Sequence, residues 1–350
     1  MTLPIPPAAA LLRWYDRHRR RMPWRALPGE RADPYRVWLS EIMLQQTTVA
    51  AVIPYYERFV RRFSTVEALA AAEDDSVMQA WAGLGYYARA RNLLACARRV
   101  VAEGGFPNNL MGLRALPGIG EYTAAAIASI AFGRAVVPVD GNVERVASRV
   151  FAITDPLPGA RRMVAGAAAR LGQDTDAEVR PADFTQALFD LGATICTPRA
   201  PACAICPWMD GCRARALGIA ETLPRKAPKA ARPLRYGAQF WLVDTAGHVL
   251  LRRRPPNGLL GGMLELPGAP WQAEPWPVAE ALTHAPQPGE WRLAGKATHG
   301  FTHFTLMMDV YAATVERITA DGLLRDVGAL ANEALPTVMR RCVRVAMQAA

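Results

Sequence analysis

Four cysteines lie within seventeen residues of this chain and restrict what the surrounding segment can become. They follow the spacing Cys196-x6-Cys203-x2-Cys206-x5-Cys212. Four thiolates so close together can hold a [4Fe–4S] cluster. Zinc is the alternative ligand, but zinc ribbons usually present two short CxxC pairs, whereas the outer spacings here are six and five. Prolines interrupt the segment, so residues 196–212 are predicted to form a metal-binding loop rather than buried core.

The other sequence features favour a reduced, cytoplasmic protein. Cys96 and Cys342 lie alone within helical patterns, which is typical of small core residues rather than of a disulfide framework. The N-terminal residues lack a charged leader before their short apolar run. No uncharged apolar run approaches the ~18 residues that a membrane span needs. We expect a monomer in the cytoplasm that does not associate with membranes.

The length of 350 residues and a change in hydrophobic periodicity and composition near residue 225 predict two domains. Apolar residues recur with helical spacing up to that point, and residues 226–235 are rich in Pro and basic residues, as in a linker. We therefore predict an all-α domain over 1–225, a linker over 226–235 and an α+β domain over 236–350. The expected helices are 34–50, 76–82, 87–102, 121–132, 142–152, 160–170, 181–192 and 335–348, and the expected strands are 240–243, 248–252 and 300–313.

The charge of the chain favours a polyanionic partner. The formal net charge is +10, of which residues 1–225 contribute +6 and residues 226–350 contribute +4. A glycine-rich hairpin, Leu116-Pro117-Gly118-Ile119-Gly120, precedes the expected helix 121–132. Its glycines allow a tight turn, and the free N–H groups of the next helix suit a phosphate. An ordinary connection between two helices would have the same pattern.

Asp140 follows twenty residues later, in Val139-Asp140-Gly141-Asn142, and opens another helical pattern. An aspartate at such a position is usually an N-cap. A capping carboxylate is ionised, so it can also stabilise a nearby positive charge.

These motifs together carry a resemblance to a known superfamily. The hairpin with its helix, then Asp140 with its neighbours, then the cysteine spacing resemble the helix-hairpin-helix DNA glycosylases. Three further segments are similar to the adenine DNA glycosylase family: Ser40–Thr47 (SEIMLQQT), Trp81–Tyr87 (WAGLGYY) and Gly258–Gly268 (GLLGGMLELPG). The resemblance implies an all-α helix-hairpin-helix glycosylase domain with an iron–sulfur cluster loop, followed by an α+β Nudix-like domain.

Cleavage of an N-glycosidic bond needs a proton donor for the base and an anion for the sugar cation. Glu41 has apolar neighbours at helical spacing, which would keep it protonated. The resemblance implies that Glu41 protonates the adenine and later helps to activate water. Asp140 would stay ionised and stabilise the sugar cation, by charge or through a transient adduct, with Asn142 as its hydrogen-bond neighbour.

Tyr122 occupies the position at which lyase-type relatives carry a lysine that forms a Schiff base with the sugar. No lysine exists anywhere in residues 1–225. The sequence therefore predicts a monofunctional glycosylase with Tyr122 in its active site.

The resemblance also implies the residues that bind DNA. Gln46 and Tyr86 would wedge into the duplex, Thr47 and Leu84 would touch the base opposite the target, and Arg25 would contact the substrate. Gly118 and Gly120 would hold the DNA backbone in the hairpin. From the residues alone, Gln46 reads as a surface side chain and Tyr86 as core.

In the second domain, Phe301-Thr302-His303 matches a Phe-Ser-His loop that is thought to read 8-oxoguanine in this family. Threonine keeps the hydroxyl but adds a methyl group, and ordinary strand residues are the plain alternative. A Nudix hydrolase needs a glutamate-rich helix, whereas the segment directly after Gly268, APWQAEPWPVAEA, has only the scattered Glu274 and Glu280. Nucleotide hydrolysis by this domain is therefore not expected.

The resulting prediction is a base-excision-repair glycosylase that removes adenine from duplex DNA when it is paired with 8-oxoguanine or guanine. A pyrimidine-damage glycosylase with lyase activity is one alternative, and Tyr122 argues against it. A non-catalytic DNA-binding protein with a structural zinc site is another. A Nudix hydrolase is the third.

Overall fold

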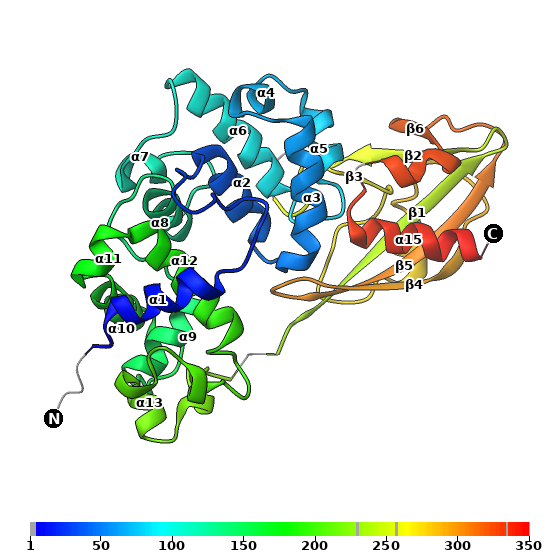
Figure 1. The fold of residues 1–350 in the computed structure, drawn as a ribbon. Coiled ribbons are helices and arrows are strands. Elements are labelled where there is room, and N and C mark those ends of the chain that lie inside the picture. The colour runs from blue at the N-terminus through cyan, green and yellow to red at the C-terminus, as the bar shows by residue number, and fades with distance from the viewer. Residues whose placement is uncertain (1–4, 229–230, 256–257, 334, 350) are drawn as a thin grey trace. The chain divides into compact units, whose positions relative to one another are not determined.

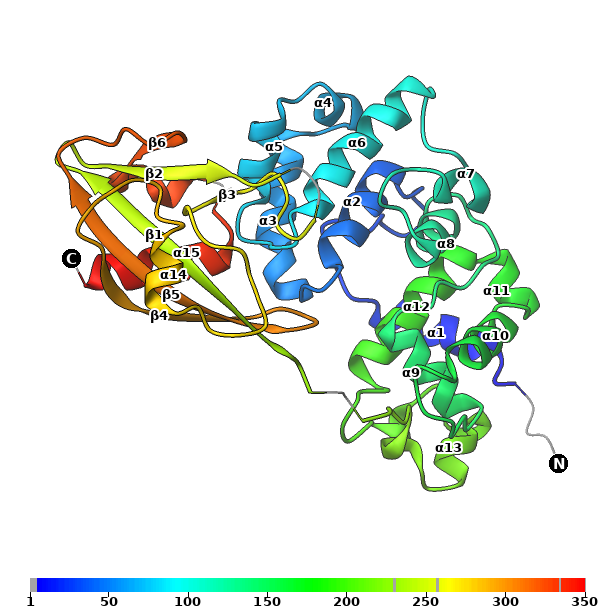
Figure 2. The ribbon, with the colours of Figure 1, turned by 180° about the vertical axis from the view of Figure 1, so that it is seen from behind.

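The computed structural model describes residues 5–228, 231–255, 258–333 and 335–349. Its contacts divide the chain into two compact units (Figures 1 and 2). The first comprises Met1–Ala71 and Asn92–Pro228, and the second comprises Ala72–Arg91 and Lys229–Ala350.

This division differs from the predicted domain ranges in one segment. Residues 72–91 carry a helical pattern, yet they group with the C-terminal residues. Arg91 donates a hydrogen bond to the Gly261 carbonyl, and Asp75 lies 3.7 Å from the Arg253 guanidinium. The ranges 1–225, 226–235 and 236–350 stay a prediction.

Helices make up the regular structure as far as Pro228 in the described residues. Their bounds are α1 (Ala8–His18), α2 (Pro34–Leu44), α3 (Val49–Arg62), α4 (Val66–Ala70), α5 (Asp74–Trp81), α6 (Ala88–Ala102), α7 (Leu110–Arg114), α8 (Glu121–Ile130), α9 (Gly141–Val150), α10 (Arg161–Leu171), α11 (Thr175–Val179), α12 (Pro181–Thr194) and α13 (Arg213–Ala216), with 3₁₀ turns η1 (Cys203–Ile205), η2 (Met209–Gly211) and η3 (Ala220–Thr222). No described helix is long and apolar enough to cross a membrane.

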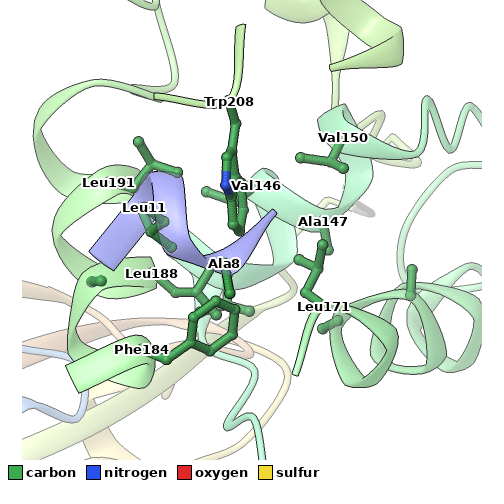
Figure 3. Packing of buried hydrophobic residues seen from close by; sticks show 14 of the residues in the cluster. Ala8, Leu11, Val146, Ala147, Val150, Leu171, Phe184, Leu188, Leu191 and Trp208 are labelled. Atoms are coloured by element: carbon green, nitrogen blue, oxygen red, sulfur yellow. The ribbon is translucent and has the colours of Figure 1, made fainter. Parts of the chain in front are cut away.

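One apolar core joins α1 to α9, α10 and α12 (Figure 3). Leu11 of α1 and Leu188 of α12 are fully buried in it, and Val146 of α9 is buried beside them. Trp208, from the cysteine loop, inserts its ring into the same core and donates Nε1–H to the Pro7 carbonyl at 3.0 Å. The cysteine loop is therefore anchored to the core formed by α1, α9 and α12.

The single helix expected over 34–50 is wrong beyond residue 44. The structure has two helices there, because Thr48 begins α3 as its N-cap and accepts a hydrogen bond from Ala51 N. Gln46, between them, has a φ of 63°, a backbone conformation that a continuous helix excludes.

The glycine hairpin joins α7 to α8. Gly118 has a φ of +74°, and a Cβ at this position would lie 2.7 Å from the Cβ of Asn92. Only glycine fits both constraints. The buried Ile119 side chain fixes the turn to the core, and the free N–H groups at the start of α8 follow Gly120.

A mixed sheet forms the centre of the second unit. Its strands are β1 (Leu234–Asp244), β2 (His248–Arg253), β3 (Leu264–Glu265), β4 (Arg292–Gly300), β5 (Thr305–Val315) and β6 (Leu323–Asp326), in the order β3-β2-β1-β5-β4, with β6 paired to β2. The β1–β5 pair is parallel and aligns Leu234 with Thr305, while the other pairs are antiparallel. The hairpin expected at 244–247 joins β1 to β2.

Helices α14 (Val278–Leu282) and α15 (Thr337–Gln348) lie on opposite faces of this sheet (Figures 1 and 2). Side chains alternate along each strand, so Trp241 packs in the cluster that contains α15, and Phe240 packs in the cluster that contains Ala281 of α14. The 3₁₀ turn η4 (Val327–Asn332) precedes α15. Of the strand expected over 300–313, residues 301–304 instead form the turn between β4 and β5.

Candidate active site

A cavity of about 570 Å³ lies among α2, α8, α12 and the start of α9. Glu41, Tyr122, Asp140 and Asn142 all line it, although they come from three separate parts of the sequence. The structure thus brings together the four side chains that were predicted to carry the chemistry.

Glu41 lies in the middle of α2 and is buried. Burial raises the pKa of its carboxyl group to about 7, while a hydrogen bond from Tyr122 opposes the shift and the charge of Asp140 adds to it. Tyr122 Oη donates to Glu41 Oε2 at 2.7 Å. Glu41 can therefore hold a proton close to neutral pH and still release it, which is what a general acid needs.

Asp140 is the N-cap of α9. Its Oδ1 accepts hydrogen bonds from Asn142 N at 2.9 Å and Val143 N at 2.8 Å, and its Oδ2 accepts from Asn142 Nδ2 at 2.9 Å. Burial raises the pKa of Asp140, but these three donors oppose that shift because they bind the charged form more strongly. The two carboxyl groups therefore have different surroundings, one largely apolar and one rich in donors.

Asn142 is itself held in place. Its Oδ1 accepts a hydrogen bond from Arg145 Nη2 at 2.9 Å. Arg145 also donates to the Gly192 carbonyl at 2.6 Å and to the Cys196 carbonyl at 2.7 Å. A Cβ on Gly192 would lie 2.5 Å from the Asn142 Cβ, so the close packing of α12 on α9 requires glycine there.

The four loop cysteines line one small cavity of about 30 Å³. Among the described residues, no three Cys, His, Asp or Glu side chains converge closely enough to bind a single metal ion. Four thiols around a common space are the ligand set of a [4Fe–4S] cluster. Arg149, which is almost completely buried, donates to Cys196 Sγ at 3.3 Å and to the Thr197 and Pro198 carbonyls.

Some of the predicted DNA-binding residues line the cavity, and others lie in the hairpin before α8. Gln46 and Thr47 lie at the cavity in the break between α2 and α3. Arg25 also lines the cavity, but Asp190 holds its guanidinium through two hydrogen bonds of 2.8 Å. Gly118 and Gly120 lie in the hairpin before α8, as described above.

In the second unit, Tyr86 is 53% exposed, so the interpretation of this side chain as core is wrong. Its φ of 49° follows the positive φ values of Gly83 and Gly85, and Leu84 between them is buried. Tyr86 Oη lies 3.4 Å from Thr302 Oγ1. Two segments that the family resemblance implied to contact DNA are therefore adjacent.

The turn that carries Thr302 rests on aromatic rings. Phe301 lies 4.7 Å from Phe304 and 5.7 Å from Trp271, between ring centroids, while His303 is exposed. This packing leaves the Thr302 and His303 side chains facing outward. Glu280 lies on the five-residue α14, so the described part of this unit lacks a glutamate-rich helix.

Sequence reasoning missed two polar residues of α12, Gln186 and Asp190. They lie one turn apart in a helix whose other side chains are largely apolar. Gln186 lines the cavity, and Asp190 is completely buried beside it. A polar pair at i, i+4 within an apolar helix was the available signal, because buried polar groups usually have assigned partners.

Comparison with known proteins agrees with this geometry. The family described as HhH-GPD superfamily base excision DNA repair protein matches residues 39–164, the iron-sulfur binding domain of endonuclease III matches 196–212, and a NUDIX domain matches 238–345. A solved structure of a thermostable thymine-DNA glycosylase is similar, with a TM-score of 0.51 and 28% identity, and covers 60% of this chain and 95% of that one. The chain is a base-excision DNA glycosylase that acts on DNA, and its cysteine loop carries a [4Fe–4S] cluster.

Two similar sequences narrow the family to which the chain belongs. The adenine DNA glycosylase of Homo sapiens is 37% identical over 88% of this chain and 66% of its own length. That of Mus musculus is 36% identical over 89% of this chain and 71% of its own length. The chain belongs to the adenine DNA glycosylase family. It spans about two thirds of the length of these two relatives.

Proposed function

We propose that this chain hydrolyses the N-glycosidic bond of adenine that is paired with 8-oxoguanine or guanine in duplex DNA. The observation that carries the proposal is that Glu41 and Asp140 line one cavity and differ in their surroundings. A base inside a duplex cannot reach such a cavity, so the adenine must first leave the stack.

Glu41 is the proton donor in this proposal. Its proton passes to a ring nitrogen of the adenine, which turns the base into a better leaving group. As the bond breaks, positive charge develops on the sugar, and the Asp140 carboxylate stabilises it. The carboxylate left on Glu41 then takes a proton from the water that attacks the sugar. The protons balance, because Glu41 loses one and regains one in each cycle.

The cavity wall offers a means of recognising adenine. Gln186 provides an amide, which has both a donor and an acceptor. Adenine presents an N6 amino group and an N7 acceptor, the pair that glutamine binds in a bidentate manner. Arg25 and Asn142 complete the polar wall, while Gln46 and Thr47 lie where the DNA strand would approach.

Tyr122 supports hydrolysis without lyase chemistry. Its hydroxyl is engaged with Glu41, and a phenol does not form a Schiff base with the sugar. Treatment with borohydride during the reaction should leave no trapped protein–DNA adduct. A strong adduct would instead favour the alternative of a pyrimidine-damage glycosylase with lyase activity.

The turn Phe301-Thr302-His303, together with Tyr86, would contact the base opposite the adenine. Thr302 and His303 face outward and offer hydrogen-bonding groups for the additional N7–H and O8 of 8-oxoguanine. The protein would act as a cytoplasmic monomer on DNA. Gly118 and Gly120 would hold the phosphate backbone at the start of α8.

The test uses duplexes that differ only in the base opposite one adenine. Abasic sites are measured after a single turnover on 8-oxoguanine, guanine, cytosine and thymine partners. We expect excision to be fastest opposite 8-oxoguanine, slower opposite guanine and weak opposite thymine. Equal rates on all four partners, or no release of adenine at all, would contradict the proposal.

A further inference from the structure

Asp190 is the most completely buried acidic residue near the cavity, at 0% exposure. Its carboxylate accepts hydrogen bonds from Arg25 Nη2 and Nη1 at 2.8 Å each, in a bidentate arrangement. It also accepts from Arg20 Nε at 2.6 Å and from Arg20 N at 3.0 Å. Every one of these donors comes from the loop between α1 and α2, whereas Asp190 lies on α12.

Burial on its own would raise the pKa of Asp190. The hydrogen bonds and charges of Arg25 and Arg20 outweigh that effect and hold the pKa below its usual value. Asp190 is therefore a fixed anion at neutral pH. The geometry is that of a strong, charge-assisted pair in which the planar fork of Arg25 matches the carboxylate.

Arg25 also faces the cavity that contains Glu41. Its positive charge lowers the pKa of Glu41, against the larger effect of burial. If Asp190 were removed, the acidic partners left on the described cavity wall would be Glu41 and Asp140. Arginine pairs readily with carboxylates, and an ion pair with Arg25 would ionise Glu41.

We propose that Asp190 is a positioning residue that binds Arg25 and so prevents it from pairing with Glu41. The inference rests on the proposed function, since it takes Glu41 as the proton donor. The other charged or titratable side chains facing the cavity are Tyr122 on α8, Asp140 at the start of α9, and Arg20. Of these, Arg20 also binds Asp190, so Asp190→Asn releases Arg20 together with Arg25.

The experiment is the pH dependence of single-turnover adenine release between about pH 5.5 and 9, with the full-length protein. In Asp190→Asn the freed Arg25 favours ionised Glu41, so the alkaline fall in rate should move to lower pH. A shift of one pH unit lowers the rate about tenfold on the alkaline side. Release should recover toward the wild-type rate at the acidic end of the range.

Arg25→Gln should move the alkaline fall in the opposite direction, to higher pH, because Glu41 loses a nearby cation. In the double variant Arg25→Gln with Asp190→Asn, Arg20 is still released, but the cation that the proposal invokes is gone, so the acidic shift should disappear. Asp183→Asn is the matched control on the same helix. Asp183 pairs with Arg180 and lies outside the cavity of Glu41, so its profile should follow the wild type.

The outcomes separate this inference from the proposed function. If Asp190→Asn lowers the rate equally at every pH, Asp190 has only a structural role and the inference is wrong. It is also wrong if the double variant keeps the acidic shift. If Asp190→Asn does not fold, the Arg25→Gln variant becomes the test. A pH dependence of adenine release that is unchanged in Arg25→Gln would then overturn the inference. A Glu41→Gln variant that releases adenine normally would remove the proposed function instead.

Discussion

At the scale of single residues, Asp140 combines a structural and a chemical task that substitution can separate. Asparagine is as good an N-cap as aspartate, whereas alanine is not. Asp140→Asn should therefore keep the two cap hydrogen bonds from Asn142 N and Val143 N while it loses that from Asn142 Nδ2 and the charge, and adenine release should fall by a factor on the order of 10² to 10³. Asp140→Ala should lose the same activity and about 1 kcal/mol of stability as well. Urea unfolding and single-turnover assays measure the two effects.

Tyr122 permits a prediction about pH. Its hydrogen bond to Glu41 Oε2 favours the ionised carboxylate and so lowers the pKa of Glu41, which burial raises to about 7. The wild-type rate should fall as the pH rises through that value, because the donor loses its proton. Tyr122→Phe removes the hydrogen bond, so this fall should move to higher pH. An unchanged pH–rate profile would show that Tyr122 does not act on Glu41.

The candidate catalytic residues could be proposed from sequence because each lies in a motif. Glu41 has apolar neighbours within α2, and Asp140 opens a helix. The partners that position them could not be proposed in the same way. Arg145 and Asp190 act across elements that are distant in sequence, and no local spacing indicates which carboxylate a given arginine will meet.

At the scale of elements, the hairpin between α7 and α8 contains two glycines with different constraints. Gly118 has a positive φ and no room for a Cβ, whereas Gly120 has an ordinary extended conformation and nothing within 4 Å. Gly118→Ala should lower the free energy of unfolding by more than about 1 kcal/mol. Gly120→Ala should change it by less than about 0.5 kcal/mol. Chemical denaturation of both variants tests the pair, and equal losses would contradict this account.

The helices that sequence periodicity predicted are present, but their ends depended on capping. The pattern of residues 34–50 continues through Gln46, and only the Thr48 cap and the positive φ of Gln46 break it. Similarly, residues 301–304 look like part of a strand, yet packing of Phe301 on Trp271 makes them a turn. In both places a segment that we propose to contact DNA lies where the local pattern was overridden.

At the scale of the whole molecule, the proposed chemistry and the proposed reading of the opposite base belong to different units. Thr302→Ala should therefore lower the preference for 8-oxoguanine over guanine by about fivefold, which is the effect of about one hydrogen bond. Thr314→Ala, at an exposed position of β5, is the matched control and should leave the preference unchanged. A comparable loss of preference in both variants would argue that the Phe301-Thr302-His303 turn does not recognise 8-oxoguanine.

The two-part architecture was predictable from the change in composition and hydrophobic periodicity near residue 225, because packed helices and a sheet covered by helices bury their apolar faces in separate cores. The assignment of Ala72–Arg91 to the second unit was not, because it depends on contacts such as that of Arg91 with Gly261. Local periodicity identifies α5 as a helix but contains no information on which of the two units it packs with.

The central claim is that Glu41 provides the proton for adenine release. The most direct measurement is the single-turnover rate of Glu41→Gln on a duplex with adenine opposite 8-oxoguanine, with binding to the same DNA as the control. Glutamine keeps the shape of the side chain and cannot donate the proton, so we predict tight binding with no detectable abasic product. Adenine release at the wild-type rate would contradict the account.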